Sequence, residues 1–102
     1  DAVNMSQLNE TNENVTNLGD TINNFAGDTT NIFTDEHGVG IRYARTNEAG
    51  LVQSDSSAEG QGSTAVGYNA TSIGESSLAL GREAQANNAN DVALGAGSVT
   101  DA

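Results

Sequence analysis

A short apolar pattern recurs at a fixed step in the C-terminal half of the chain. An apolar–alanine–apolar–glycine unit occurs at residues 64–67, 78–81 and 92–95, with Thr64 as a polar exception. The central alanines of the three units are therefore 14 residues apart. A fixed period is typical of a repeat array, in which stacked units together bury faces that one unit could not bury alone. The pattern predicts a β-solenoid over residues 63–99.

Within each repeat, the two apolar residues are separated by one alanine. In an extended strand such a pair lies on one face and the alanine on the other. We expect the apolar columns to form the core of the solenoid, through Val66, Leu78, Leu80, Val92 and Leu94. The alanine column indicates close approach of another backbone. Glycine can turn the chain tightly after each strand, which predicts repeat turns at Gly67, Gly81 and Gly95.

The N-terminal third carries a different period. Its apolar and threonine residues follow the a and d positions of a heptad, at Leu8, Thr11, Val15, Leu18, Ile22, Phe25, Thr29 and Ile32. The stripe is narrow, whereas a helix that faces a globular core usually shows a wider one. We therefore predict a coiled-coil stalk over residues 8–33. A single amphipathic helix packed on its own β-domain remains the alternative.

The region between these two patterns, residues 34–62, is expected to connect helix to strand. Asp and Gly favour turns, so residues 35–38 and 46–50 are predicted to be turns around an extended segment at 39–45. Leu51 lies one period before Ala65 and is a candidate for a degenerate first repeat. Residues 54–62 are rich in Ser and Gly and are predicted to form a loop.

Composition and charge narrow the class of protein. The 102 residues are only 35% hydrophobic and include no cysteine. A chain of this kind has difficulty burying a core of its own, which favours association with other chains. The formal net charge of −11 makes nucleic acid and anionic membranes poor direct partners. No apolar run approaches the roughly 20 residues that span a bilayer, so no membrane insertion by this segment is expected.

No catalytic, metal or cofactor site is predicted. His37 beside Asp35 and Glu36 lacks a second His or Cys at ligand spacing, and a solvated turn is the simpler interpretation. No repeated column places a pair of acids for glycoside hydrolysis. We expect Arg42 and Arg45 to pair with nearby carboxylates. Tyr68 and Arg82 share an exposed column and are the candidate surface contacts.

Three stretches together resemble the trimeric autotransporter adhesins of Gram-negative bacteria. Residues 1–8 (DAVNMSQL) are similar to the neck of that family, which leads from β-structure into a coiled coil. Residues 40–47 (GIRYARTN) and 55–58 (DSSA) resemble the DALL-type connectors of the long enterobacterial fibres. Residues 63–67 (STAVG) and their two successors resemble the repeats of a β-roll head. Residues 100–102 (TDA) would begin the next neck, so we expect the chain to be a segment of a longer fibre.

The resemblance implies a mixed α and β fibrous homotrimer. It would consist of a neck (1–8), a parallel trimeric coiled coil (8–33), a DALL-like β connector (34–62) and a left-handed parallel β-roll with 14-residue repeats (63–99). Such a segment is structural and adhesive rather than enzymatic. It would act at the bacterial cell surface in adhesion, autoaggregation or biofilm formation, anchored to the outer membrane through a region absent here. Its partners would be copies of itself, extracellular matrix proteins or sister fibres.

One function of a different class remains open. A regular solenoid of small repeats could be a self-contained surface-binding or ice-binding module. Such a module requires a flat column of like residues, often Thr. Thr64, Thr71 and Thr100 do not share a column at the 14-residue step, which weighs against this alternative.

Overall fold

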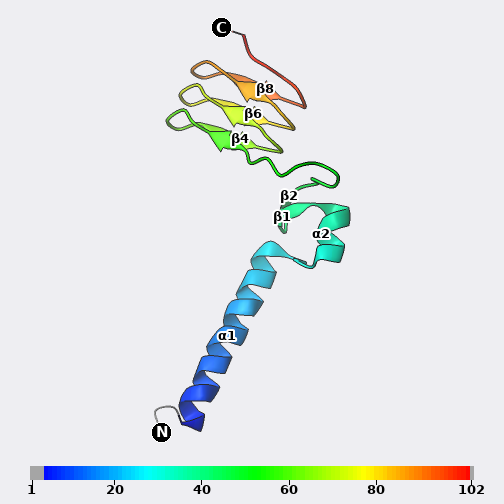
Figure 1. Cartoon of the computed structure of the whole chain (residues 1–102). Helices are drawn as coiled ribbons and strands as arrows, with labels where there is room; N and C mark the ends of the chain where they lie inside the picture. Colours follow the sequence, from blue (N-terminus) through cyan, green and yellow to red (C-terminus); the bar gives the residue numbers. More distant parts are fainter. Residues whose placement is uncertain (1–3, 102) are drawn as a thin grey trace. The chain divides into compact units, whose positions relative to one another are not determined.

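The computed structural model describes residues 4–101, and the chain divides into two compact units, residues 1–49 and 50–102 (Figure 1). Residues 1–3 of the predicted neck and residue 102 of the predicted next neck lie outside the described residues. The first unit contains two helices and a hairpin: α1 (Met5–Ala26), α2 (Asn31–His37), β1 (Val39–Ile41) and β2 (Ala44–Thr46). The second unit contains six short strands.

Helix α1 begins at a reciprocal cap. The backbone N–H of Gln7 donates to Asn4 Oδ1 over 2.8 Å, and the backbone N–H of Asn4 donates to Gln7 Oε1 over 3.2 Å. These two bonds satisfy donors that have no partner inside the helix. Part of the stretch expected to form the neck, residues 5–8, is therefore already helical.

The helix ends earlier than the heptad pattern predicted. Gly27 follows Ala26 with φ of 75°, a conformation that other residues rarely adopt. Thr29 lies between the two helices, and Ile32 lies on the short helix α2. The prediction of one continuous helix over residues 8–33 is therefore wrong after Ala26. Thr29 and Ile32 cannot continue the stripe of α1.

The segment after the break also differs from expectation. The predicted turn at residues 35–38 is the end of α2, and His37 stacks on Phe33 with ring centroids 4.3 Å apart. The segment at 39–45 is not one strand. It folds into an antiparallel hairpin in which Val39 pairs with Thr46 and Ile41 with Ala44. Periodicity alone could not reveal a reversal at Arg42 and Tyr43, because neither residue is a typical turn former.

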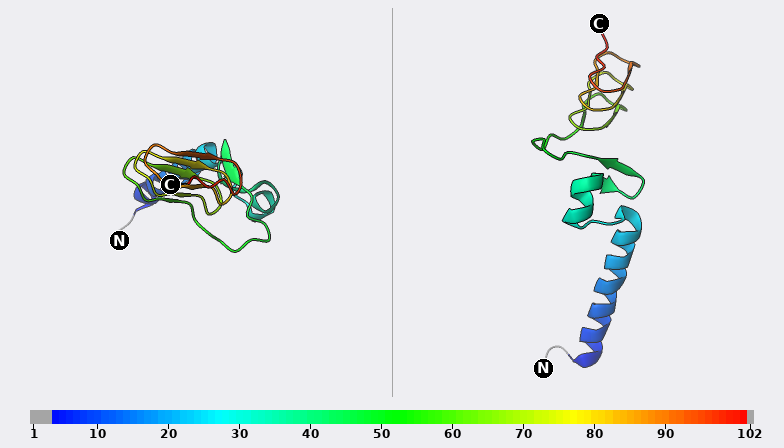
Figure 2. Two further views of the ribbon diagram at one scale, coloured as in Figure 1. Left: turned by 90° about the horizontal axis from the view of Figure 1, so that it is seen from above. Right: turned by 90° about the vertical axis from the view of Figure 1, so that its right-hand side faces the viewer.

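The second unit winds through two parallel ladders, seen from two directions in Figure 2. One ladder joins β3 (Ser57–Ala58), β5 (Thr71–Ser72) and β7 (Gln85–Ala86). The other joins β4 (Thr64–Val66), β6 (Leu78–Leu80) and β8 (Val92–Leu94). Each turn of chain thus carries two short strands, where the sequence predicted one.

Two expectations for the start of the second unit are wrong. Strand β3 lies inside the stretch 54–62 that was predicted to be a loop. Leu51 belongs to no strand, so it does not form a degenerate first repeat. The register nevertheless follows the alanines, since Ala65 pairs with Ala79 and Ala79 with Ala93.

The interior of the second unit is filled by small side chains only. Its buried residues are Ala70, Ser72, Gly74, Ser77, Ala79, Ala84, Ala86 and Ala93. Ser72 is the largest fully buried side chain among the described residues, and its hydroxyl bonds to that of Ser77 over 2.5 Å. The predicted core of the roll is therefore inverted within one chain. The alanines face inward, whereas Val66, Leu80, Val92 and Leu94 are exposed and Leu78 is half-buried.

Candidate interaction surfaces

The outer face of sheet β4-β6-β8 presents two parallel apolar columns. Thr64, Leu78 and Val92 form one column, and Val66, Leu80 and Leu94 form the other, as the ladder registers show. Val66, Leu80, Val92 and Leu94 are between 42% and 58% exposed in the single chain. Scattered exposed apolar residues are ordinary, but a contiguous set on one sheet marks an interaction surface.

The outer face of sheet β3-β5-β7 is more polar. Its paired positions bring Ser57, Thr71 and Gln85 into one column, and a single bridge adds Val99 beside Gln85. The outer faces of the two sheets therefore differ in polarity. Sequence reasoning missed this second column. The sequence does contain a signal for this column, because a small residue stands on each side of it. Ala70 and Ser72 flank one position of the column, and Ala84 and Ala86 flank the next position, one period later.

Helix α1 exposes its own apolar stripe. Leu8, Val15, Leu18, Ile22 and Phe25 lie on α1 and are between 44% and 66% exposed. Thr11 lies in the same stripe, and its hydroxyl donates to the carbonyl oxygen of Gln7 over 3.0 Å. Because that bond satisfies the hydroxyl locally, Thr11 presents mainly its methyl group to a partner.

The predicted turn glycines follow strands β4, β6 and β8. Gly67, Gly81 and Gly95 have φ of 124°, 129° and 100°, in the region that favours glycine. They also stack closely, since a Cβ on Gly67 would lie 2.8 Å from the carbonyl oxygen of Gly81. Glycine is therefore favoured at these positions both by the positive φ and by the close spacing of adjacent turns.

The two candidate surface contacts differ in role. The guanidinium carbon of Arg82 lies 5.7 Å from the centre of the Tyr68 ring, within the range of a cation–π contact. Tyr68 is half-buried, and its hydroxyl donates to the carbonyl oxygen of Val52 over 2.5 Å. Tyr68 therefore anchors the strand-free segment that precedes β3. Arg82 is exposed and is the one cation of residues 50–102.

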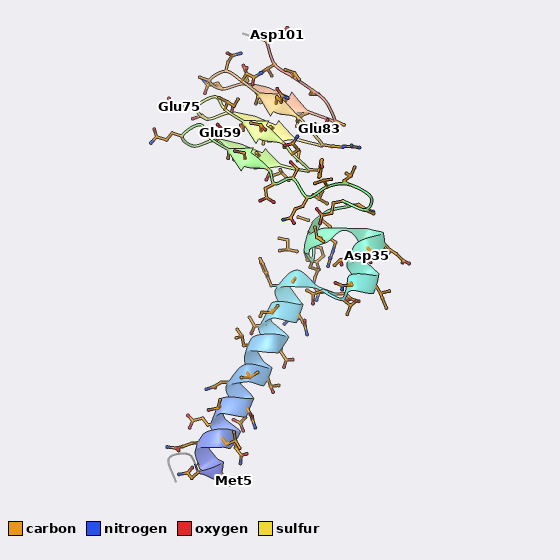
Figure 3. All side chains as sticks on the ribbon, in the orientation of Figure 1. Met5, Asp35, Glu59, Glu75, Glu83 and Asp101 are labelled. Carbon is orange, nitrogen blue, oxygen red and sulfur yellow. The ribbon has the colours of Figure 1, made fainter. Side chains whose placement is uncertain are left out.

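Apart from Arg82, the charged residues of the second unit are all acidic. Glu75 and Glu83 project from the connections between strands (Figure 3). Hydrogen bonding lowers the pKa of two aspartates below the ordinary value. At Asp28 the largest cause is the side-chain bond from Thr30, and at Asp91 it is the side-chain bond from Thr100. Both carboxylates thus serve local loop structure.

We expected Arg42 and Arg45 to pair with carboxylates, but within residues 4–101 neither forms such an ion pair. Arg42 and Arg45 donate to main-chain carbonyl oxygens at the end of α1 instead. Among residues 4–101, no group of three or more His, Asp or Glu side chains could hold a metal ion. Within the same range, no helix has the length and apolar character to cross a membrane.

Comparison with known proteins shows similarity to bacterial surface adhesins. Residues 54–70, 58–81 and 72–98 match the YadA head domain repeat. The chain is also 50% identical over 68 residues to the autotransporter adhesin EhaG of Escherichia coli O157:H7. That alignment covers 67% of the chain but only 4% of the adhesin. No solved structure matches the chain at a significant level.

Proposed function

Because the chain belongs to the trimeric autotransporter adhesins, we propose that three parallel copies form one segment of a bacterial surface fibre. The segment would combine a neck, a coiled-coil stalk, a DALL-like connector and a left-handed β-roll. It would project from the cell while a region outside this chain anchors the fibre in the outer membrane. Membership of this family indicates a structural role rather than an enzymatic one.

The outer apolar columns of sheet β4-β6-β8 carry this proposal. The interior of each turn is already filled by Ala and Ser, so Leu80 and Leu94 cannot be buried by refolding within one chain. Burying a Leu or Val side chain that water otherwise covers contributes about 1.5–3 kcal/mol. Copies of the same chain present the same columns at the same spacing, and closed symmetry lets each copy cover the next.

The stripe of α1 independently supports association of parallel copies. Helices that expose a narrow a/d stripe are marginal alone in water and are stabilised by partner helices. Val15 and Ile22 at a with Leu18 at d are compatible with a small number of parallel strands. A threefold arrangement would bury the stripe of α1, and the same number of copies would bury the apolar columns of the second unit.

Sheet β3-β5-β7 would then form the outer wall of the trimer. Its polar column and the exposed Arg82 would meet extracellular matrix proteins or sister fibres. Adhesion, autoaggregation and biofilm formation are the activities that this surface would serve. Replacing both Tyr68 and Arg82 with Ala should weaken cell adhesion, and unchanged adhesion would remove them as contacts.

A matched pair of variants tests the assembly. Leu80→Asp places a charge in the apolar column, and Gln85→Asp places the same charge on the opposite sheet, at a position that is also exposed. Sedimentation equilibrium of the 102-residue chain should give the mass of three copies for the wild type and for Gln85→Asp. Leu80→Asp should give the mass of one. A three-copy mass for Leu80→Asp would refute the assignment of this face.

A further inference from the structure

The C-terminal end of α1 is closed by side chains from the hairpin. The last four carbonyl groups of an α-helix have no partner inside the helix. Here the carbonyl oxygens of Asn23 and Asn24 each accept a bond from the Arg42 guanidinium over 2.9 Å. The carbonyl oxygen of Phe25 accepts from the backbone N–H of Arg42 over 3.0 Å. That of Ala26 accepts from Arg45 Nη2 over 2.7 Å.

Residues 17 to 19 positions further along the chain thus donate to all four terminal carbonyls. The Asn23 carbonyl also accepts from the backbone N–H of Gly27 over 2.8 Å. The last turn of α1 contains no basic residue of its own. Cations favour the C-terminal end of a helix because its carbonyl dipoles leave a partial negative charge there. The two guanidinium groups supply that charge. They are also the only donors among the described residues that reach the carbonyl oxygens of Asn24 and Ala26.

Arg45 is held in place by its surroundings. Its guanidinium carbon lies 4.9 Å from the centre of the Phe33 ring, and Nη1 donates to the carbonyl oxygen of Gly38 over 3.2 Å. Gly27 leaves the space that this requires, since a Cβ there would lie 2.6 Å from Arg45 Nη2. The side chain is half-buried and so well positioned before any load is applied.

We propose that Arg42 and Arg45 form a mechanical clamp at the end of the stalk. The inference rests on the proposed function, because a surface fibre is pulled along its length when the cell is displaced. Tension that enters through α1 would pass directly from residues 23–26 to residues 42–45. Residues 27–41, which hold α2 and β1, would carry little of it. The clamp would therefore keep this segment folded until its bonds break.

The clamp predicts a defined change in length. Once the bonds between α1 and the hairpin open, residues 27–41 join the extended chain. Fifteen residues at about 3.3–3.6 Å each would add roughly 50 Å of contour length. Such an extension would absorb load before the apolar contacts of the fibre separate.

Single-molecule pulling of the full chain tests this prediction. The chain contains no cysteine, so single cysteines added at its two ends give unique handles. The wild type should show an extension step of roughly 50 Å. In the double variant R42M and R45M the step should move to lower force, or the starting contour should already be longer by that amount. The variant R82M removes the remaining cation and should match the wild type.

The clamp fails if all three proteins give the step at the same force, or if the wild type shows no step of this length. Amide hydrogen exchange provides a readout without force. Residues 24–27 should exchange about tenfold faster in the double variant, since lost bonds to charged donors fray the last turn. Equal exchange would also count against the clamp. Solution mass is measured on the same samples, so failure to trimerise is distinguished from failure of the clamp.

Discussion

Replacement of Gly74 with Ala should separate the turns of the second unit. A Cβ at this position would lie 2.0 Å from the carbonyl oxygen of Asn88, against 3.4 Å or more for ordinary contact. The clashing atoms belong to the backbone of the next turn and cannot rotate away. The φ of Gly74 lies outside the positive range, so the effect is steric and not conformational.

The cost follows from what must move. The distance between the new Cβ and the Asn88 carbonyl oxygen must increase by well over an ångström, so the chain at residue 74 must move away from the next turn. Two hydrogen bonds span this gap, from the backbone N–H groups of Ile73 and Gly74 to the carbonyl oxygen of Ala86, over 2.8 and 3.2 Å. Overpacking costs about 1–3 kcal/mol, and each weakened bond adds about 1 kcal/mol. We expect a loss of about 3–5 kcal/mol per chain in the free energy of unfolding.

Urea denaturation followed by circular dichroism, at one fixed protein concentration, measures this loss. Gly97→Ala is the matched control, because Gly97 has φ of 70° and open space within 4 Å of a Cβ. That variant should cost only about 1 kcal/mol, from the left-handed backbone alone. If Gly74→Ala is as stable as Gly97→Ala, the conclusion that a Cβ at residue 74 would clash with the neighbouring turn is refuted.

Three further predictions concern the first unit. Gly19→Ala should stabilise α1 by about 0.8–1 kcal/mol, seen in thermal melting by circular dichroism, because a Cβ there meets nothing and alanine favours the helix. Asn4→Ala should destabilise the same helix by about 1 kcal/mol, since the cap at its first turn is lost. The pKa of Asp28, measured by NMR titration, should lie below its ordinary value. Thr30→Val should raise this pKa, because the variant lacks the hydroxyl that donates to the carboxylate. Because the folded pKa is lowered, the stabilisation from Asp28 is present above about pH 3.9 and is lost as the pH falls through the folded value. Asp28→Asn should remove that part of the acid dependence.

Local patterns predicted much of the chain. The a/d residues of α1 are visible in sequence because a helix brings residues three and four apart to one face. The alanine step of the second unit is visible for a similar reason, since stacked turns place equivalent residues side by side. The ladders pair Ala65 with Ala79 and Ala79 with Ala93.

The errors arose where two local patterns fit the residues equally well. Residues 39–45 suit one strand, yet they form a hairpin whose reversal is stabilised by Arg42 reaching back to α1. The interior of the second unit is the clearer case. An apolar pair that flanks an alanine shows which residues share a face, but alternation alone does not say which face is inside.

The sequence by itself determined the family resemblance, the division into helix and repeat, and the spacing of the repeats, because all three depend on periods within short windows. Only the tertiary structure decided that alanine and serine fill the interior and that leucine and valine face out. The reason is the width of each turn, in which two parallel sheets approach so closely that no larger side chain fits between them. The tertiary structure also decided how the C-terminal end of α1 is capped. Arg42 and Arg45 follow the helix in sequence, but their side chains fold back and donate to its last carbonyl groups.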